Sequence, residues 1–362
     1  MSENSQHIGY KKCRDGRIVV LEILGKHNED REGIVDEQFA KMRCSRARVI
    51  RIYNMHDQTI EYEEAFGIHD ETFRYEINKV VEPVNGFDED LDEVCGSGIH
   101  YFLTEEPAYY WKYKPETGLY KLWYENGQMR SRYTSKNGKP DGLHESWYSN
   151  GLMDLRYTHR NGKRDGPYES WYENGQMWAR CIYKNGKLDG LYESWYLNGR
   201  MSWYENDQMW ERCIYKNGKL DGLYESWHSN GRMRKRCTYK NGKPDGLHES
   251  WQSNGLIEER YTYKNGKKNG SYELWHSNGR IEKRCTYKNG EVDGLYELWY
   301  SNSQIRDRYT FKNGKLDGPC ELWNSNGQMW DRCTYKNGKK DDFYISCYKT
   351  GQMSVQCAYR NE

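Results

Sequence analysis

The chain has 362 residues, of which 36% are hydrophobic and 30% charged, and its mean hydropathy is −1.16. Such a polar composition is typical of disordered chains, but those are poor in aromatic residues, and 15% of the residues here are aromatic. The net charge of +1 leaves no surplus of cations for phosphate groups, so we expect no nucleic-acid partner. The composition favours a thin fold that buries aromatic stripes and leaves much polar surface in water.

The N-terminal residues Met1–His7 are polar and do not resemble a signal peptide. No apolar stretch approaches the length of a membrane span. We therefore expect a reducing, cytosol-like compartment, in which the 11 cysteines are free thiols rather than a disulfide framework.

Residues 1–110 carry no repeat and predict a small α+β or mainly β domain. The segments Arg17–Gly25 and Ala47–Asn54 are rich in β-branched residues and are predicted strands. A short helix is predicted within Asp30–Met42. We expect this domain to cover the first edge of the sheet that follows, because bare sheet edges promote aggregation. Residues 111–117 form the junction.

Two features of this domain have residues that could form a chemical site. Cys13, Cys44, Cys95 and His100 could bind a metal, but their spacing lacks the close cysteine pairs of structural zinc sites. A cysteine nucleophile with a histidine base is the other alternative, and no third member of a triad is identifiable. The acidic loop Glu82–Glu93 lacks the alternation and glycine of an EF-hand. We therefore predict no catalytic residue, no cofactor and no metal, and a protein that is not an enzyme.

A 24-residue unit repeats over residues 118–362, with one step eight residues longer, and repeats of this kind indicate stacked structural units. Asn-Gly occurs twice per unit between aromatic runs, which predicts hairpins with type I′ turns. About ten units then form an elongated single-layer antiparallel β-ribbon of two strands per unit. The eight-residue insertion predicts a protruding loop near residues 197–208. The anchor glycines, taken as position 1, are Gly118, Gly142, Gly166, Gly190, Gly222, Gly246, Gly270, Gly294 and Gly318.

A two-residue loop at the first Asn-Gly fixes the register and places position 4 opposite position 15. Opposite charges then face each other, and each such pair contributes roughly 0.2–1 kcal/mol. The end copies lack the pair, as capping units do, because Lys121 faces Arg132 and Ile345 faces Gln356. The predicted pairs are Glu145–Arg156, Glu169–Arg180, Glu225–Arg236, Glu249–Arg260, Glu273–Arg284, Glu297–Arg308 and Glu321–Arg332.

The opposite side of the ribbon is predicted to carry an aromatic stripe, and Trp at position 6 accompanies the charged pairs. Position 16 is cysteine in some copies and tyrosine in the others, which indicates packing. Only Cys320, directly opposite Cys333, has a geometry in which a disulfide is conceivable. The histidines at ring positions, such as His144 and His248, are expected to pack as rings. The stripe comprises Tyr168, Tyr172, Tyr183, Tyr192, Tyr224, Tyr239, Tyr272, Tyr287, Tyr296 and Tyr335.

The motif G-x-Y-E-x-W-Y-x-N-G-Q-M, as in Gly166–Met177, resembles the MORN repeats, in particular the variant with W-Y-x-N-G. The resemblance covers residues 118–362 and implies elongated antiparallel sheets that act as scaffolds and partner-binding surfaces, with lipid binding also proposed. The segment Cys95–Lys112 resembles the end of a small domain found in proteins of large DNA viruses of the Marseillevirus group. Neither resemblance supplies catalytic residues.

We therefore expect a non-enzymatic scaffold that presents its aromatic repeat surface to protein partners, either viral structural proteins or further copies of itself. The resemblance to viral proteins implies a capsid-associated virion component or a protein of the host cytoplasm. The alternatives are a peripheral membrane module that binds phospholipid through its lysine-rich turns, and an adaptor for a host factor.

Overall fold

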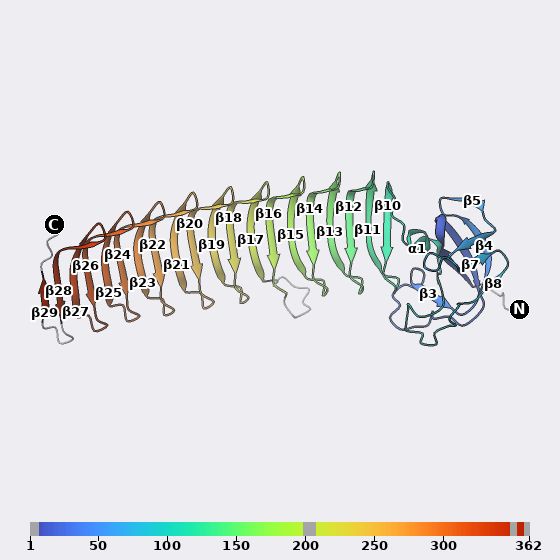
Figure 1. Cartoon of the computed structure of the whole chain (residues 1–362), viewed down its shortest axis with the longest axis horizontal. Helices are drawn as coiled ribbons and strands as arrows, with labels where there is room; N and C mark the ends of the chain where they lie inside the picture. The colour runs from blue at the N-terminus through green and yellow to red at the C-terminus, as the bar shows by residue number, and fades with distance from the viewer. Residues whose placement is uncertain (1–6, 198–207, 348–352, 358–362) are drawn as a thin grey trace. The chain divides into compact units, whose positions relative to one another are not determined.

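The computed structural model describes residues 7–197, 208–347 and 353–357. The chain divides into two compact units, Met1–Gln176 and Met177–Glu362. The first unit holds the N-terminal domain and the first five strands of the tandem segment, and the second unit holds the other strands (Figure 1). The fold is mainly β, as the sequence predicts.

The N-terminal domain is built around an antiparallel sheet with the strand order β3-β9-β1-β2-β4-β5, and β8 pairs with β4. The strands of this sheet are β1 (Ile8–Lys12), β2 (Arg17–Ile23), β3 (Lys41–Cys44), β4 (Ala47–Asn54), β5 (Asp57–Glu61), β8 (Val80–Val81) and β9 (Ile99–Phe102). The remaining elements are a 3-10 turn, η1 (Arg14–Gly16), a two-stranded sheet of β6 (Glu64–Phe66) and β7 (Arg74–Glu76), and the helix α1 (Glu105–Tyr110).

Strand β2 lies at the centre of the domain because its run of apolar residues can be buried on both faces. Val19 and Leu21 belong to one core cluster. Ile18 and Val20 belong to a second cluster, together with Ala108 of α1. The helix α1 therefore helps to close the second face of the sheet. The two strands predicted in this region are confirmed as β2 and β4.

The helix predicted within Asp30–Met42 is wrong. The segment forms turns, and strand β3 begins at its end. One turn is closed where Ala40 donates its amide to the carbonyl of Asp36 at 3.0 Å, but the amide of Val35 donates instead to the carbonyl of Asn126 at 2.9 Å. Because Asn126 lies in the first turn of the tandem segment, this loop is held by a distant part of the chain rather than by local helical bonds.

Within each unit, every strand of the tandem segment pairs antiparallel with the next one along the chain. In the first unit the strands are β10 (Gly118–Trp123), β11 (Met129–Lys136), β12 (Lys139–Trp147), β13 (Met153–Arg160) and β14 (Lys163–Trp171). In the second unit they are β15 (Met177–Lys184), β16 (Lys187–Trp195), β17 (Met209–Lys216), β18 (Lys219–Trp227), β19 (Met233–Lys240), β20 (Lys243–Trp251), β21 (Ile257–Lys264), β22 (Lys267–Trp275), β23 (Ile281–Lys288), β24 (Glu291–Trp299), β25 (Ile305–Lys312), β26 (Lys315–Trp323), β27 (Met329–Lys336), β28 (Lys339–Cys347) and β29 (Met353–Cys357).

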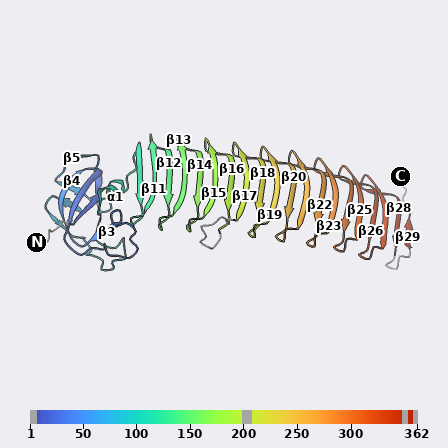
Figure 2. The ribbon, with the colours of Figure 1, turned by 180° about the vertical axis from the view of Figure 1, so that it is seen from behind.

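Two kinds of turn alternate at opposite ends of the strands (Figure 2). At Asn137-Gly138, both residues have positive φ, 52° and 70°, and Lys136 pairs with Lys139. This is the two-residue type I′ turn that the sequence predicts. The same Asn-Gly turn recurs along both units, with Arg160 in place of the lysine before Asn161.

The other Asn-Gly of each unit does not form the predicted type I′ turn. At Asn150-Gly151 only the glycine has positive φ, 85°, and its amide donates to the carbonyl of Tyr148 at 3.0 Å. Tyr148 pairs in turn with Leu152, so the loop has three residues. A bulge between the pairs of Ser146 and Trp147 then shifts the register by one residue. The two offsets cancel, so the strand bodies keep the register of a two-residue loop.

The anchor glycines mark a second bulge. Gly142 has a φ of 107°, and a Cβ added there would lie 2.4 Å from the Thr134 hydroxyl oxygen. That hydroxyl donates to the carbonyl of Asp141. Position 1 therefore requires glycine for both backbone conformation and space, which explains why it punctuates the repeat.

The predicted insertion loop lies almost wholly outside the described residues. In the second unit, strands β16 and β17 on either side of it pair directly, with Trp195 opposite Met209. The amide of Tyr196 donates to the carbonyl of Gln208 at 3.0 Å. Strands β16 and β17 thus form a hairpin although the insertion separates them in the sequence.

Candidate functional sites: the repeat faces and the N-terminal cavity

One face of the repeats carries a ladder in which each glutamate at position 4 lies between arginines of both neighbouring strands. In the first unit the Glu145 carboxylate lies 2.6 Å from Nε of Arg132 and 3.5 Å from Nε of Arg156. In the second unit the Glu193 carboxylate lies 2.6 Å from Arg180 and 3.1 Å from Arg212. The sequence analysis had paired each glutamate with one arginine only.

The carboxylates are more buried than the arginines, and the difference is largest at Glu193, whose side chain is 1% exposed while that of Arg212 is 48% exposed. The guanidinium groups lie over indole rings, as Arg132 does over Trp147 at 5.4 Å and Arg260 over Trp275 at 5.7 Å. We call this side, with Glu at position 4, Trp at position 6 and Arg at position 15, the ladder face.

The structure places the predicted charged residues in this ladder. Directly opposite each other are Glu145–Arg156, Glu225–Arg236, Glu249–Arg260, Glu273–Arg284, Glu297–Arg308 and Glu321–Arg332. Within the first unit Glu169 lies opposite Arg156, and within the second Arg180 lies opposite Glu193. The pair Glu193–Arg212 was missed because the insertion separates its members, although the motif Tyr-Glu-Ser-Trp at 192–195 marks it.

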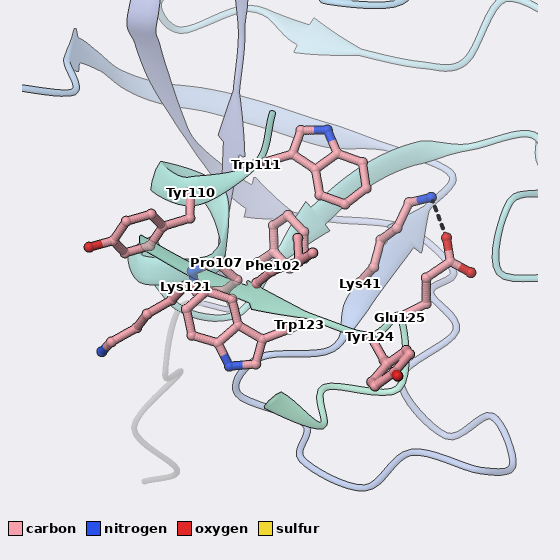
Figure 3. A pocket seen from close by; sticks show the side chains of 10 residues that line it. Lys41, Phe102, Pro107, Tyr110, Trp111, Lys121, Trp123, Tyr124 and Glu125 are labelled. Atoms are coloured by element: carbon pink, nitrogen blue, oxygen red, sulfur yellow. Dashed lines mark hydrogen bonds and ion pairs between the residues drawn. The ribbon is translucent and has the colours of Figure 1, made fainter. Parts of the chain in front are cut away.

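At the start of the tandem segment, the N-terminal domain supplies the missing carboxylate. Lys121 takes the glutamate position on β10 and faces Arg132, and its ammonium lies 2.5 Å from the Glu106 carboxylate of α1. Figure 3 shows Lys121 and Trp123 beside the helix residues Pro107 and Tyr110. The pocket between them has a volume of about 20 Å³, which is space for one water and not for a ligand.

The opposite side, which we call the tyrosine face, is largely self-covered. In the second unit Tyr272 is 7% exposed. The Lys268 ammonium lies 4.1 Å from the ring centre of Tyr261 and 4.3 Å from that of Tyr272, and 3.5 Å from the Glu259 carboxylate. The other predicted stripe residues are half-buried: Tyr168, Tyr172, Tyr183, Tyr192, Tyr224, Tyr239, Tyr287, Tyr296 and Tyr335.

Histidines pack as rings on this face, and His144 stacks on Tyr133 and Tyr157 at 5.1 and 4.7 Å. At position 7, histidine and tyrosine make the same hydrogen bond to the next repeat. His228 bonds the carbonyl of Trp251 at 2.8 Å, as the Tyr148 hydroxyl bonds that of Trp171 at 2.7 Å. Position 7 therefore stabilises the turn, rather than contributing to an exposed stripe.

Large apolar side chains are exposed on the ladder face instead. Position 2 is on the same side of the strand as position 4, and it pairs with position 17, as Leu191 does with Ile214. These two side chains are 38% and 41% exposed. The row continues with exposed leucines at position 2 of other repeats: Leu119, Leu143, Leu223, Leu247 and Leu295. The sequence analysis did not predict this row, because it placed the exposed apolar surface at the tyrosines.

The cysteines of the tandem segment are packing residues. Cys213 is 0% exposed, and burial raises the pKa of its thiol to about 12. Cys320 and Cys333 lie opposite each other, as the register requires, and both are free thiols. Burial likewise raises the pKa of both thiols.

In the N-terminal domain the four candidate metal ligands, which are Cys13, Cys44, Cys95 and His100, do not come together. Cys13 and Cys44 are buried in the core. Cys95 is exposed, with its sulfur 3.3 Å from the Lys41 ammonium. Nε2 of His100 lies 3.2 Å from the carbonyl oxygen of Val94.

Over the described ranges, 7–197, 208–347 and 353–357, three side chains could share a metal ion: His7, His27 and Glu29. Their carboxylate is already engaged, since it lies 2.7 Å from Nε2 of His7 and accepts the hydroxyl of Tyr101. The same part of the chain contains no helix long and apolar enough to cross a membrane.

The acidic loop encloses a cation of the protein itself. The Arg43 side chain is buried, and its guanidinium donates to the carbonyls of Asp88 at 2.6 Å and Glu93 at 2.8 Å. It also lies 4.6 Å from the ring centre of Phe87. Carbonyl oxygens that would suit a calcium ion therefore bind an arginine.

A cavity of about 500 Å³ opens in the N-terminal domain. Strands β1, β3 and β9 contribute Lys11, Lys12, Lys41 and His100 to its lining. The rest comes mostly from the loops at 67–70, 83–85 and 95–98. A cavity of this size is in the range that binds small molecules.

Comparison with known proteins assigns both parts of the chain. Residues 1–108 match a family of unknown function, DUF5758. The MORN repeat variant matches at residues 116–137, 164–185, 220–241, 268–289 and 316–337. No curated protein matches.

Among solved structures, "Crystal Structure of TcdB2-TccC3" aligns over 94% of this chain at 8% identity with a TM-score of 0.15. This chain spans 23% of that one, and so weak a likeness supports no conclusion. The chain is thus a MORN repeat variant protein that carries an N-terminal domain of the DUF5758 family.

Proposed function

We propose that the protein is a non-enzymatic scaffold whose ladder face binds protein partners. The observation that carries this proposal is the row of exposed leucines beside half-exposed arginines. Leu223 and Leu247, for example, are 39% and 46% exposed next to the ladder arginine Arg236, which is 49% exposed. Arginine and apolar anchors together are typical of interfaces, and extended apolar rows on a surface mark interaction sites.

The repeat itself provides a substitution that tests the leucine row. Position 2 is serine in one copy, Ser271, so a Leu→Ser change there is compatible with the fold. We expect the triple variant Leu191→Ser, Leu223→Ser, Leu247→Ser to lose most of the proteins that cross-link to the full-length wild type in its native cell. Circular dichroism should show unchanged strand content. A variant that recovers the same partners in the same yield would contradict the proposal.

The nature of the partner rests on resemblance alone. The similarity of Cys95–Lys112 to proteins of large DNA viruses supports a capsid-associated role, or recruitment of a host factor in the cytoplasm. Mass spectrometry of purified particles should then detect peptides of this protein at a constant ratio to the capsid protein. Its absence from the particles would leave the cytoplasmic role as the proposal.

A second candidate function, binding to an anionic membrane surface, is favoured by the type I′ turns. Their lysines face each other directly, as Lys216 does Lys219 and Lys240 does Lys243. Like charges in this position are destabilising, so a row of such turns at one edge has a cost that an anionic surface would offset. Flotation with phosphatidylserine vesicles should carry the protein upward at low salt and release it at high salt. Co-flotation that is insensitive to salt would exclude this mode.

A further inference from the structure

The cavity of the N-terminal domain contains buried ammonium groups that no carboxylate neutralises. Nζ of Lys11 donates to the carbonyl of His100 at 3.0 Å, and Nζ of Lys12 donates to the carbonyl of Tyr109 at 3.1 Å. Within the described part of the chain, neither lysine has an ion-pair partner within 4.0 Å. Burial lowers the pKa of both, that of Lys12 to about 8. Burying an unpaired charge is costly, so these groups favour an anion.

The third lysine of the cavity has one carboxylate partner at its rim. Nζ of Lys41 lies 3.2 Å from the Glu125 carboxylate and 5.4 Å from the ring centre of Trp111. The carboxylate among the residues that line the cavity, Asp70, accepts two hydrogen bonds from Thr72. Cations therefore outnumber anions around the space.

Two histidines that line the cavity have a lowered pKa. The pKa of His100 is lowered to about 4, first by burial and then by Lys41 and Lys11. The pKa of His69, which lines the same cavity, is also lowered by burial and then by Lys112, Lys11 and Lys41. Both imidazoles are therefore neutral near pH 7, and the N–H of His100 is directed at the carbonyl of Val94, which leaves its Nδ1 as an acceptor.

The remaining wall is aromatic and apolar. Phe73, Tyr75, Phe102 and Trp111 line the cavity. The rings of Phe102 and Trp111 lie 5.7 Å apart. Such a wall accommodates a planar ring, whereas the lysines accommodate more than one negative charge. Lysine is a common phosphate ligand because its ammonium acts as a point charge.

We propose that this cavity binds a small phosphorylated molecule that carries a planar ring, as nucleotides and phosphorylated ring cofactors do. The phosphate lies against the ammonium group of Lys11, with Lys41 at the rim, and the ring packs on the aromatic wall. This site is independent of the ladder face, and its ligand would give the N-terminal domain a role that the repeats do not supply.

Isothermal titration calorimetry of the full-length protein at pH 7 tests the site with AMP, GMP and riboflavin 5′-phosphate. We expect at least one of them to bind with a Kd below 1 mM, and at least tenfold more tightly than both its dephosphorylated counterpart and pyrophosphate. If none of the three binds, or if pyrophosphate binds as tightly as the best of them, the proposal is wrong.

Variants separate binding from folding. Lys11→Met should weaken binding at least tenfold, whereas Lys26→Met should not. Lys26 is exposed, lies outside the cavity and pairs with Glu89 at 2.8 Å. Removal of a buried unpaired charge should leave the melting temperature of Lys11→Met unchanged or higher. Unaltered affinity in Lys11→Met would overturn the assignment.

Discussion

Replacement of Glu193 by glutamine tests whether the ladder stabilises the sheet. The carboxylate is 1% exposed and is shared by Arg180 and Arg212 at 2.6 and 3.1 Å. A hydrogen bond to a charged group contributes about 1.5–3 kcal/mol, whereas an exposed ion pair contributes about 0.2–1 kcal/mol. Because both arginines are about half exposed, we expect Glu193→Gln to cost about 2 kcal/mol in local stability.

Repeat arrays need not unfold in a single step, so hydrogen exchange of the β16 and β17 amides is the appropriate assay. A cost of about 2 kcal/mol corresponds to roughly thirtyfold faster exchange, since 1.4 kcal/mol is tenfold. Glu249→Gln is the matched comparison, with a side chain 13% exposed and Arg260 at 2.9 Å, and should cost about half as much. Glu291→Gln, at the exposed first residue of β24, should cost no more than about 0.5 kcal/mol. Equal effects of all three substitutions would refute the argument.

Three further predictions concern single residues of the chain. Gly246→Ala should be more destabilising than Gly338→Ala in urea titrations, because a Cβ at Gly246 would lie 2.3 Å from a threonine oxygen whereas the one at Gly338 meets nothing within 4 Å. His248 has a pKa lowered to about 4 by burial, so the stability it supports is present above pH 6.5 and is lost as the pH falls toward 4. His248→Tyr, the residue of other repeats at this position, should therefore reduce the acid sensitivity of unfolding. Cys95 is exposed and Cys213 buried with a pKa raised to about 12, so iodoacetamide at pH 8 should alkylate Cys95 first, as peptide mass spectrometry can show.

The repeat architecture was predictable because its signals are local and recur. Asn137-Gly138 specifies its turn by itself, and the facing charges of Glu249 and Arg260 agree with the register that the turn imposes. The conformation at Asn150-Gly151 was not predictable in this way. An Asn-Gly pair suits both a two-residue and a three-residue loop, and the bulge that restores the register has no sequence mark.

The N-terminal domain was predictable only in part, because its important contacts join residues far apart in the chain. The loop near Val35 is fixed by Asn126, and Arg43 organises the carbonyls of a segment some fifty residues away. The cavity is equally non-local, since Lys12 and Lys41 come from different strands. No spacing rule applied to the sequence brings such residues together.

The alternation of glutamate and arginine along the ladder has a consequence for how such arrays change in evolution. Every added copy brings one glutamate and one arginine into the row, so duplication leaves the charge balance of the row untouched. The ends need separate treatment, and at the first copy Glu106 neutralises Lys121. Gain or loss of whole copies in the gene can thus change the number of repeats, while the residues that close the first end of the ladder stay the same.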